Sequence, residues 1–262
     1  MIIKQKILRV LAQRWVGFIF LIFIFSTCKE NHNDKIRVAT AANMRSAMEE
    51  LIQVYANKSG SEFELVVGSS GKLTAQILEG APYDIFVAAN MKYPEAVFHG
   101  GKSLNPPKVY ADGQLVLWSM EDNTSVSIDE LSNSNIEHIA LANPKTAPYG
   151  LAALEVLQHY GINKTLAPKL VYGESIGQTD QFIISKAAQI GFTALSTVLS
   201  QNMRGKGRWV LLDPTLYAGI NQGVVLVNRN GDSNPEAQGF YDFLFSKEAK
   251  EVLKEFGYLV DE

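Results

Sequence analysis

Two short runs of small polar residues each follow a strand-like segment and precede a helix-like one. They are residues 40–44, with the sequence TAANM, and residues 67–71, with the sequence VGSSG. Hydroxyl and amide side chains at such turns lie beside backbone N–H groups of the next helix that have no partner within it, and these groups can hold an anion. Neighbouring parallel strands end at one edge of a sheet, so we expect both turns to reach one ligand.

An alternation of strands and helices positions these turns. The spacing of apolar residues predicts strands over 36–42, 63–67 and 83–88. We expect Asn43 to cap the helix after the first strand and Ser70 to cap the helix after the second. This part of the chain therefore reads as a series of strand–helix units.

A second set of such units follows, and a long strand over 114–120 leads into it. Further strands are expected over 139–142, 170–172, 190–195, 209–212 and 223–227, and helices over 149–160, 176–188, 235–245 and 247–256. Two such sets predict an α/β protein with two lobes, each a mostly parallel sheet flanked by helices, and a ligand cleft between them. We place the first lobe at 36–114 plus 226–262 and the second at 115–225.

The composition is typical of a folded protein whose net charge produces no strong electrostatic field. The chain has 262 residues, of which 47% are hydrophobic, and its 24 basic and 27 acidic side chains give a formal net charge of -3. No nucleic-acid partner is expected from this balance. The four histidines show no metal-ligand spacing, so we expect no metal cation and no cofactor.

The N-terminal residues 1–28 have the layout of a secretory signal. Basic residues precede an apolar run that is short for a membrane span, and Cys28, the sole cysteine, follows directly. This position resembles the lipidation site of bacterial lipoproteins, although an ordinary signal peptide with an incidental cysteine is the alternative. We expect an exported protein of the periplasm or cell surface, joined to the membrane only through a lipid on Cys28, with residues 29–35 as a tether.

Four segments of the chain, in order, resemble the molybdate-binding proteins of bacterial ABC importers. They are ATAANMRSAMEEL, GSSGKLTAQILEGAPYDIFVAAN, ALANPKTAPYGLAALEVL and FYDFLFSKEAKEVLKEFGY. The resemblance implies a periplasmic-binding-protein fold of the second type and no catalytic activity. It also implies capture of molybdate, and of tungstate as well, for delivery to a membrane permease and its ATPase. We expect a monomer.

The resemblance implies an oxyanion site made of hydroxyls, amides and backbone N–H groups. The matching positions in this chain are Ala42, Asn43, Ser69, Ser70, Tyr149 and Ile176. Asn43 stands where many relatives have Ser, and its side-chain amide is expected to donate to the ligand. Ala194 stands where some relatives have a ligating Tyr, and we expect the Tyr149 hydroxyl to replace it from the opposite side.

The chemistry of these residues agrees with that expectation. Molybdate is a dianion whose oxygens only accept hydrogen bonds, so a suitable site supplies donors and no carboxylate. Taken singly, Asn43 and Ser70 could also be helix caps alone. Two alternative functions stay open. In the first, the ligand is another anion, such as sulfate, phosphate or a small organic acid. In the second, the fold serves as an enzyme or a sensor module, which would need a catalytic group or a signalling domain, and the sequence offers neither.

Overall fold

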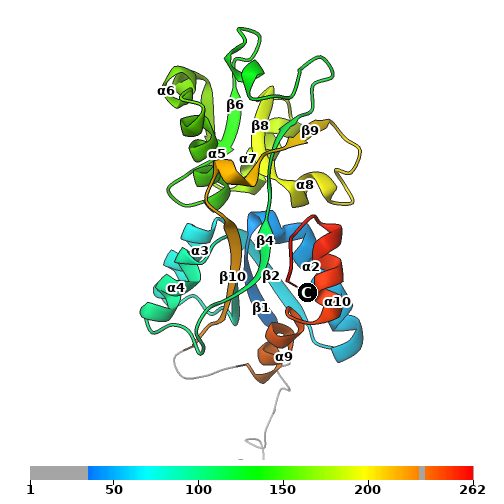
Figure 1. Cartoon of the computed structure of the whole chain (residues 1–262). Coiled ribbons are helices and arrows are strands. Elements are labelled where there is room, and N and C mark those ends of the chain that lie inside the picture. Colours follow the sequence, from blue (N-terminus) through cyan, green and yellow to red (C-terminus); the bar gives the residue numbers. More distant parts are fainter. Residues whose placement is uncertain (1–34, 230–233, 262) are drawn as a thin grey trace, which may run out of the picture. The chain divides into compact units, whose positions relative to one another are not determined.

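The computed structural model of the chain describes residues 35–229 and 234–261 (Figure 1). The expected signal peptide, Cys28 and residues 29–34 of the expected tether lie outside the described residues. Lys35–Glu262 forms one compact unit. Within the described ranges, no helix is both long enough and apolar enough to cross a membrane.

The first lobe is built on a sheet with the strand order β2-β1-β3-β10-β4. β1 pairs in parallel with β2 and β3, whereas β10 runs antiparallel to both of its neighbours, so the sheet is mixed. The strands are β1 (Ile36–Ala41), β2 (Phe63–Gly68), β3 (Ile85–Ala88), β4 (Lys108–Gly113) and β10 (Ile220–Leu226). The helices are the short 3₁₀ turn η2 (Ala42–Met44), α2 (Arg45–Ser59), α3 (Ser70–Leu78), α4 (Lys92–His99), α9 (Pro235–Phe243) and α10 (Lys247–Glu255).

The second lobe repeats this plan with the strand order β7-β6-β8-β5-β9. β6 pairs in parallel with β7 and β8, and β5 runs antiparallel to β8 and β9. The strands are β5 (Leu115–Ser119), β6 (Ile139–Ala142), β7 (Leu170–Gly173), β8 (Ile190–Ala194) and β9 (Arg208–Leu211). The helices are α5 (Pro148–His159), α6 (Asn163–Leu166), α7 (Ile176–Ile184) and α8 (Leu195–Leu199), with 3₁₀ turns η3 (Asp129–Ser132), η4 (Ala167–Lys169) and η5 (Pro214–Leu216).

The chain passes between the lobes twice, after β4 and before β10 (Figure 1). β10 pairs with β3 and β4, so the chain returns to the first sheet at Ile220. The lobe division expected from the sequence kept residues 220–225 in the second lobe, and the pairing of β10 corrects it. The expected strand over 223–227 also begins earlier than predicted, at Ile220.

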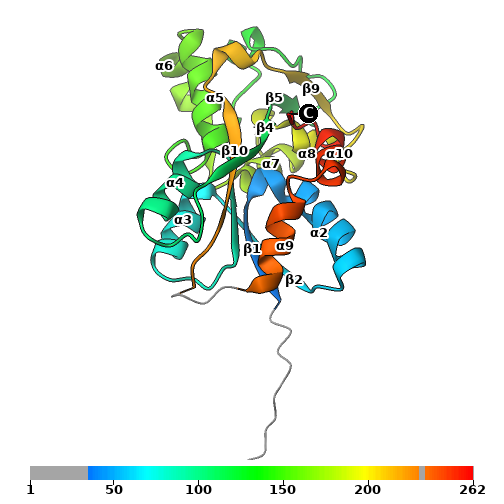
Figure 2. The same ribbon diagram turned by 60° about the horizontal axis from the view of Figure 1, so that its bottom comes forward.

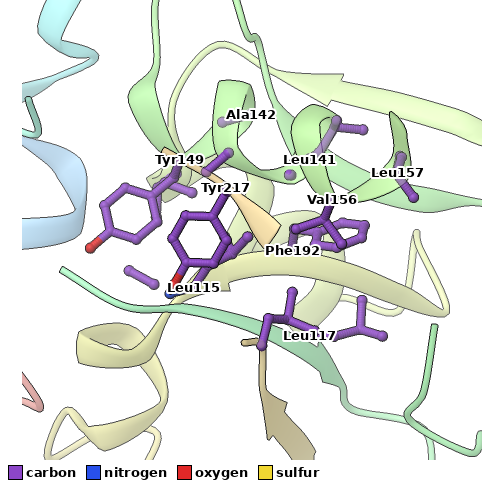
Figure 3. Packing of buried hydrophobic residues seen from close by; sticks show 14 of the residues in the cluster. Leu115, Leu117, Leu141, Ala142, Tyr149, Val156, Leu157, Phe192 and Tyr217 are labelled. Atoms are coloured by element: carbon purple, nitrogen blue, oxygen red, sulfur yellow. Dashed lines mark hydrogen bonds between the residues drawn. The ribbon is translucent and has the colours of Figure 1, made fainter. Parts of the chain in front are cut away.

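Both sheets are covered by helices on their two faces. In the first lobe, α2, α9 and α10 pack one apolar cluster against β1 and β10, and α3 and α4 pack another on the opposite face (Figure 1, Figure 2). In the second lobe, α5 covers one face of the sheet. Figure 3 shows the α5 side of this core, where Val156 and Leu157 lie near Leu141 and Phe192. These layers hold the carboxyl ends of β1, β2 and β6 in place.

Candidate functional site

A pocket gathers the turns that follow the strands. Its free space is about 200 Å³ when the part open to solvent is counted, which suits a small ion better than a sugar or a peptide. The lining residues are Ala41, Ala42, Asn43, Gly68, Ser69, Ser70, Ala89, Ala147, Pro148, Tyr149 and Ile176. All six positions expected to bind a ligand are among them, and they come from both lobes.

The start of α3 brings two serines to the pocket with different roles. The cap of this helix is Ser69, whose hydroxyl accepts from the Lys72 N–H at 3.4 Å, so the expectation that Ser70 is the cap is wrong. The Ser70 hydroxyl instead accepts from the backbone N–H of Ala89 at 3.0 Å. With an oxygen lone pair engaged in this way, the Ser70 O–H proton is available to a ligand.

Asn43 differs from its expected role. It lies inside η2, and its side chain caps no helix. Its Nδ2 donates to Gln222 Oε1 at 2.9 Å and to the Tyr258 hydroxyl at 3.0 Å. Both hydrogens of the amide are therefore engaged within the protein, and its side-chain N–H₂ is not free for a ligand in this arrangement. Asn43 is nevertheless one of the residues that line the pocket.

Tyr149 presents a buried hydroxyl to the pocket. The residue follows the first residue of α5 and is 1% exposed. Its hydroxyl lies close to the Asn43 amide and the Tyr258 hydroxyl but makes no well-formed hydrogen bond within the described chain. Burial, followed by the nearby Tyr258, raises the pKa of Tyr149 well above its usual value, so the hydroxyl keeps its proton. In Figure 3 the Tyr149 ring lies beside that of Tyr217. An unpaired buried donor is costly unless a ligand or water accepts from it.

Helix N-termini supply further donors. α3, α5 and α7 all begin at the pocket, at Ser70, Pro148 and Ile176. The first N–H groups of a helix have no partner within it, and the helix dipole favours an anion there. The start of α7 lies against the first turn, since a Cβ on Gly177 would be 3.7 Å from the Ala42 Cβ. Ala194 is buried in β8 and is not among the lining residues.

Main-chain and ionic contacts connect the lobes beside this pocket. The Gly71 N–H donates to the Thr146 carbonyl oxygen at 2.9 Å, which ties the start of α3 to the loop before α5. Lys72 and Glu174 form an ion pair at 2.8 Å, but both side chains are more than half exposed, so water screens it. The main-chain bond, between two partly buried residues, is therefore the stronger guide to how the lobes meet.

The site is neutral. None of the lining residues is charged, and the described residues contain no cluster of three or more His, Cys, Asp or Glu side chains that could hold a metal ion. The arrangement offers O–H and N–H donors to a small acceptor. It holds no nucleophile paired with a base, and Ser70 and Ser69 have backbone partners rather than a histidine.

Comparison with known proteins identifies the family. A family model described as bacterial extracellular solute-binding protein matches residues 36–259. The chain belongs to this family. Its members are solute-binding components of transport, and the two-lobed fold of the second type expected for this solute-binding protein is confirmed.

Named relatives of this solute-binding protein match over most of their length. The chain is 34% identical over 228 residues to the molybdate-binding protein ModA of Rhodobacter capsulatus, which covers 87% of this chain and 89% of that protein. It is 36% identical over 230 residues to that of Azotobacter vinelandii, with coverage of 86% and 89%. The solved periplasmic molybdate-binding protein of Azotobacter vinelandii superposes with a TM-score of 0.82 at 31% identity, over 87% of this chain and 100% of that one.

Three buried residues around the site of this solute-binding protein were missed by sequence reasoning. Gln222, Ser196 and Tyr258 contact Asn43 from β10, α8 and the segment after α10. Gln222 lies in β10 next to Asn221, and alternation along the strand, with Gln222 on the same face as Ile220 and Val224, was the signal for a buried hydrogen-bonding role. Ser196 and Tyr258 carry no comparable local signal, because only the fold brings them to Asn43.

Proposed function

We propose that this protein captures molybdate, and tungstate as well, and delivers it to an ABC importer. The observation that carries the proposal is a neutral pocket, lined from both lobes, in which donors face a small space without a carboxylate. The names of the relatives that match over most of the chain support the same ligand.

The donor set favours a fully deprotonated oxyanion. A dianion accepts hydrogen bonds at every oxygen, so the Ser70 hydroxyl, the Tyr149 hydroxyl and helix N–H groups can all donate to it. Each helix N-terminus adds about 0.3–1 kcal/mol of favourable interaction with an anion, and more where it is buried. A hydrogen phosphate would present its own proton, for which this lining holds no carboxylate acceptor. Sulfate differs from molybdate chiefly in its smaller size, so it would fill the donor shell less well.

We assign roles to the six lining residues expected to bind the ligand. Ser70 and Tyr149 donate from side-chain hydroxyls. Ala42, Asn43 and Ile176 contribute backbone N–H groups, and Ser69 holds the α3 turn through its cap. Asn43 differs here from the role expected from sequence, because its amide hydrogens are bound to Gln222 and Tyr258.

The proposal extends to the surroundings of the protein. Export and lipidation at Cys28 would hold it at the membrane surface, where a permease and its ATPase receive the anion. The position of the sole cysteine after an apolar run supports the anchor. The protein acts as a monomer in this scheme, because each chain supplies both lobes of its pocket.

Isothermal titration calorimetry of residues 35–262 tests the ligand. Molybdate, tungstate, sulfate and phosphate are titrated separately at the same pH and salt. Tight one-to-one binding of the first two, with no heat from the other two, is the expected result. Binding of sulfate or phosphate alone would show that the ligand is that anion and not molybdate. If none of the four anions binds, the proposal is overturned.

The Ser70→Ala variant tests the site in the same measurement. Loss of this hydroxyl removes one donor to the ligand, and we expect affinity to fall by about 1–2 kcal/mol, or roughly 5- to 30-fold. The matched control is Ser200→Ala, because the Ser200 hydroxyl is buried and donates to the Thr197 carbonyl oxygen within the second lobe. Equal affinities for both variants and the wild type would remove Ser70 from the site.

A further inference from the structure

A buried hydrogen-bond network joins the two lobes next to the pocket. The Ser196 hydroxyl, on α8 of the second lobe, donates to the Asn43 carbonyl oxygen at 2.8 Å. The Tyr258 hydroxyl, in the segment after α10, lies 3.0 Å from the same oxygen and 3.1 Å from Ser196 Oγ. All three residues are at most 5% exposed, so water competes little for these bonds.

The network holds the side-chain amide and the backbone carbonyl of Asn43 in place. Tyr258 and Gln222 accept the two amide hydrogens, and the backbone carbonyl accepts from the hydroxyls. Gln222 is held in turn, because its Nε2 donates to the Ile220 carbonyl oxygen at 2.9 Å. The turn that lines the pocket is thus oriented from the first lobe by Gln222 and Tyr258, and Ser196 completes the set from the second lobe.

The segment that carries Tyr258 also contacts the point where the chain passes between the lobes. Gln114, which lies between β4 and β5, donates from Nε2 to the Gly257 carbonyl oxygen at 2.8 Å. Asp112 and Leu259 exchange two backbone hydrogen bonds at 2.7 and 2.9 Å. The Gln114 carbonyl oxygen accepts from the Leu195 N–H at 2.9 Å, directly before Ser196. Tyr258 and Ser196 therefore each follow a residue that is hydrogen-bonded to this linking segment.

We propose that Ser196 and Tyr258 are positioning residues that, with Asn43, form a latch between the lobes. The latch bonds lie beside the segment that links the lobes, so they hold the lobes at the closed angle and set the fraction of protein that is closed before a ligand binds. The effect on affinity rests on the proposed oxyanion binding. Neither hydroxyl belongs to the pocket lining, so the latch changes affinity without changing the choice of anion.

The size of the effect follows from the closed fraction. Only the closed protein offers both halves of the pocket, so the apparent dissociation constant equals the intrinsic one divided by the closed fraction. Removal of one buried interlobe hydrogen bond is expected to reduce the equilibrium constant for closure by about 5- to 10-fold, and the affinity by up to that factor. Ser196→Ala and Tyr258→Phe should each act in this way.

The first test measures closure without any ligand. Residues 35–262 contain no cysteine, because Cys28 is the only one in the chain, so cysteines at Lys92 on α4 and Lys164 on α6 can carry spin labels. Pulsed electron paramagnetic resonance then gives the distribution of distances between the two labels, one on each lobe. We expect Ser196→Ala and Tyr258→Phe to shift this distribution towards longer distances. The controls Ser200→Ala and Tyr110→Phe, which remove buried hydroxyls outside the latch, should match the wild type.

The second test measures affinity by calorimetry with molybdate and tungstate. Both latch variants should bind each anion more weakly, by up to about 10-fold, with an unchanged ratio between the two. The double variant should lose less than the product of the single losses, since both hydroxyls bind the same carbonyl oxygen. Unchanged interlobe distances in the latch variants would overturn the latch, even if their melting temperatures fell. A wild type that binds neither anion would instead overturn the proposed function, while the distance measurement still decides the latch.

Discussion

Tyr149 places a hydroxyl that makes no well-formed hydrogen bond within the described chain at the edge of a neutral pocket. Its Phe variant keeps the ring and its packing in the core of the second lobe, so only the donor is lost. We expect molybdate affinity to fall by about 1–2 kcal/mol, measured by calorimetry at one pH. Tyr110→Phe is the matched control, because Tyr110 also has a buried hydroxyl without a described partner and lies outside the lining. Equal affinity of Tyr149→Phe and the wild type would exclude the phenol as a donor.

Asp180 should make stability depend on pH. It is buried on α7, and its carboxylate accepts hydrogen bonds from the hydroxyls of Thr193 and Thr197. No basic side chain of the described residues pairs with it. Burial raises its pKa from 3.8 to about 7. Below about pH 4 the group is protonated in both the folded and the unfolded chain and changes nothing. As the pH rises to 7 only the unfolded chain loses the proton readily, so folding stability falls.

The Asp180→Asn variant tests this sign. It removes the buried charge, so its free energy of unfolding should exceed that of the wild type by an amount that grows from pH 4 to pH 8 and reaches a few kcal/mol. Urea unfolding at pH 4, 6 and 8 measures the difference. A difference that stays constant with pH would show that the carboxylate does not titrate in this range.

The sequence allowed the residues that line the pocket to be predicted, but not the hydrogen bonds that they make. The six lining residues expected to bind a ligand could be named from the turns that carry them and from the family resemblance. The partners of Asn43 could not, because Gln222 and Tyr258 are distant in sequence and meet it only after the sheet and the C-terminal helices have formed. Whether the six residues contact an anion stays a prediction.

At the scale of elements, the end of β4 is constrained by the pocket. A Cβ on Gly113 would overlap the Tyr149 hydroxyl and come within 2.9 Å of Gln222 Nε2. We expect Gly113→Ala to destabilise the fold by about 1–3 kcal/mol through overpacking, measured by chemical unfolding. The double variant Gly113→Ala, Tyr149→Phe should recover part of this loss, because the overlapping oxygen is gone. If the double variant is no more stable than Gly113→Ala, the overlap with the Tyr149 hydroxyl is not the source of the strain.

Regular elements could be predicted where their patterns were strong. The strands that become β1, β2 and β6 and the helices that become α5 and α10 were expected close to their actual bounds, since their apolar spacing is clear. β4 was missed because Lys, Asp and Gly are unfavourable in strands and it lies at an edge of its sheet. α4 was missed because it is short and contains Pro94.

The placement of β10 required tertiary information. Its sequence is apolar in the same way as a strand of the second lobe, so local pattern does not say which sheet it joins. Antiparallel pairing to β3 and β4 decides it. Each sheet is mixed because one strand enters it from the other lobe in the opposite direction. This strand is β5 after the first passage and β10 after the second.

For the whole molecule, ligand binding and stability should be linked. A ligand that binds only the folded protein adds about 2.7 kcal/mol to the free energy of unfolding at 100 times its dissociation constant. We expect molybdate at this excess to raise the melting temperature in one cooperative transition, because the pocket is lined from both lobes. Scanning calorimetry with and without the anion measures it. Sulfate at the same concentration serves as the control, and an equal rise with sulfate would contradict the proposed selectivity.

The bond between the Gly71 N–H and the Thr146 carbonyl oxygen joins the lobes through main-chain atoms alone. A Cβ at position 71 would come within 3.1 Å of Thr146 atoms, so glycine keeps the approach open. Thr146 can be exchanged for many residues without loss of its carbonyl. Side chains around the pocket can therefore be substituted while this main-chain bond between the lobes is kept.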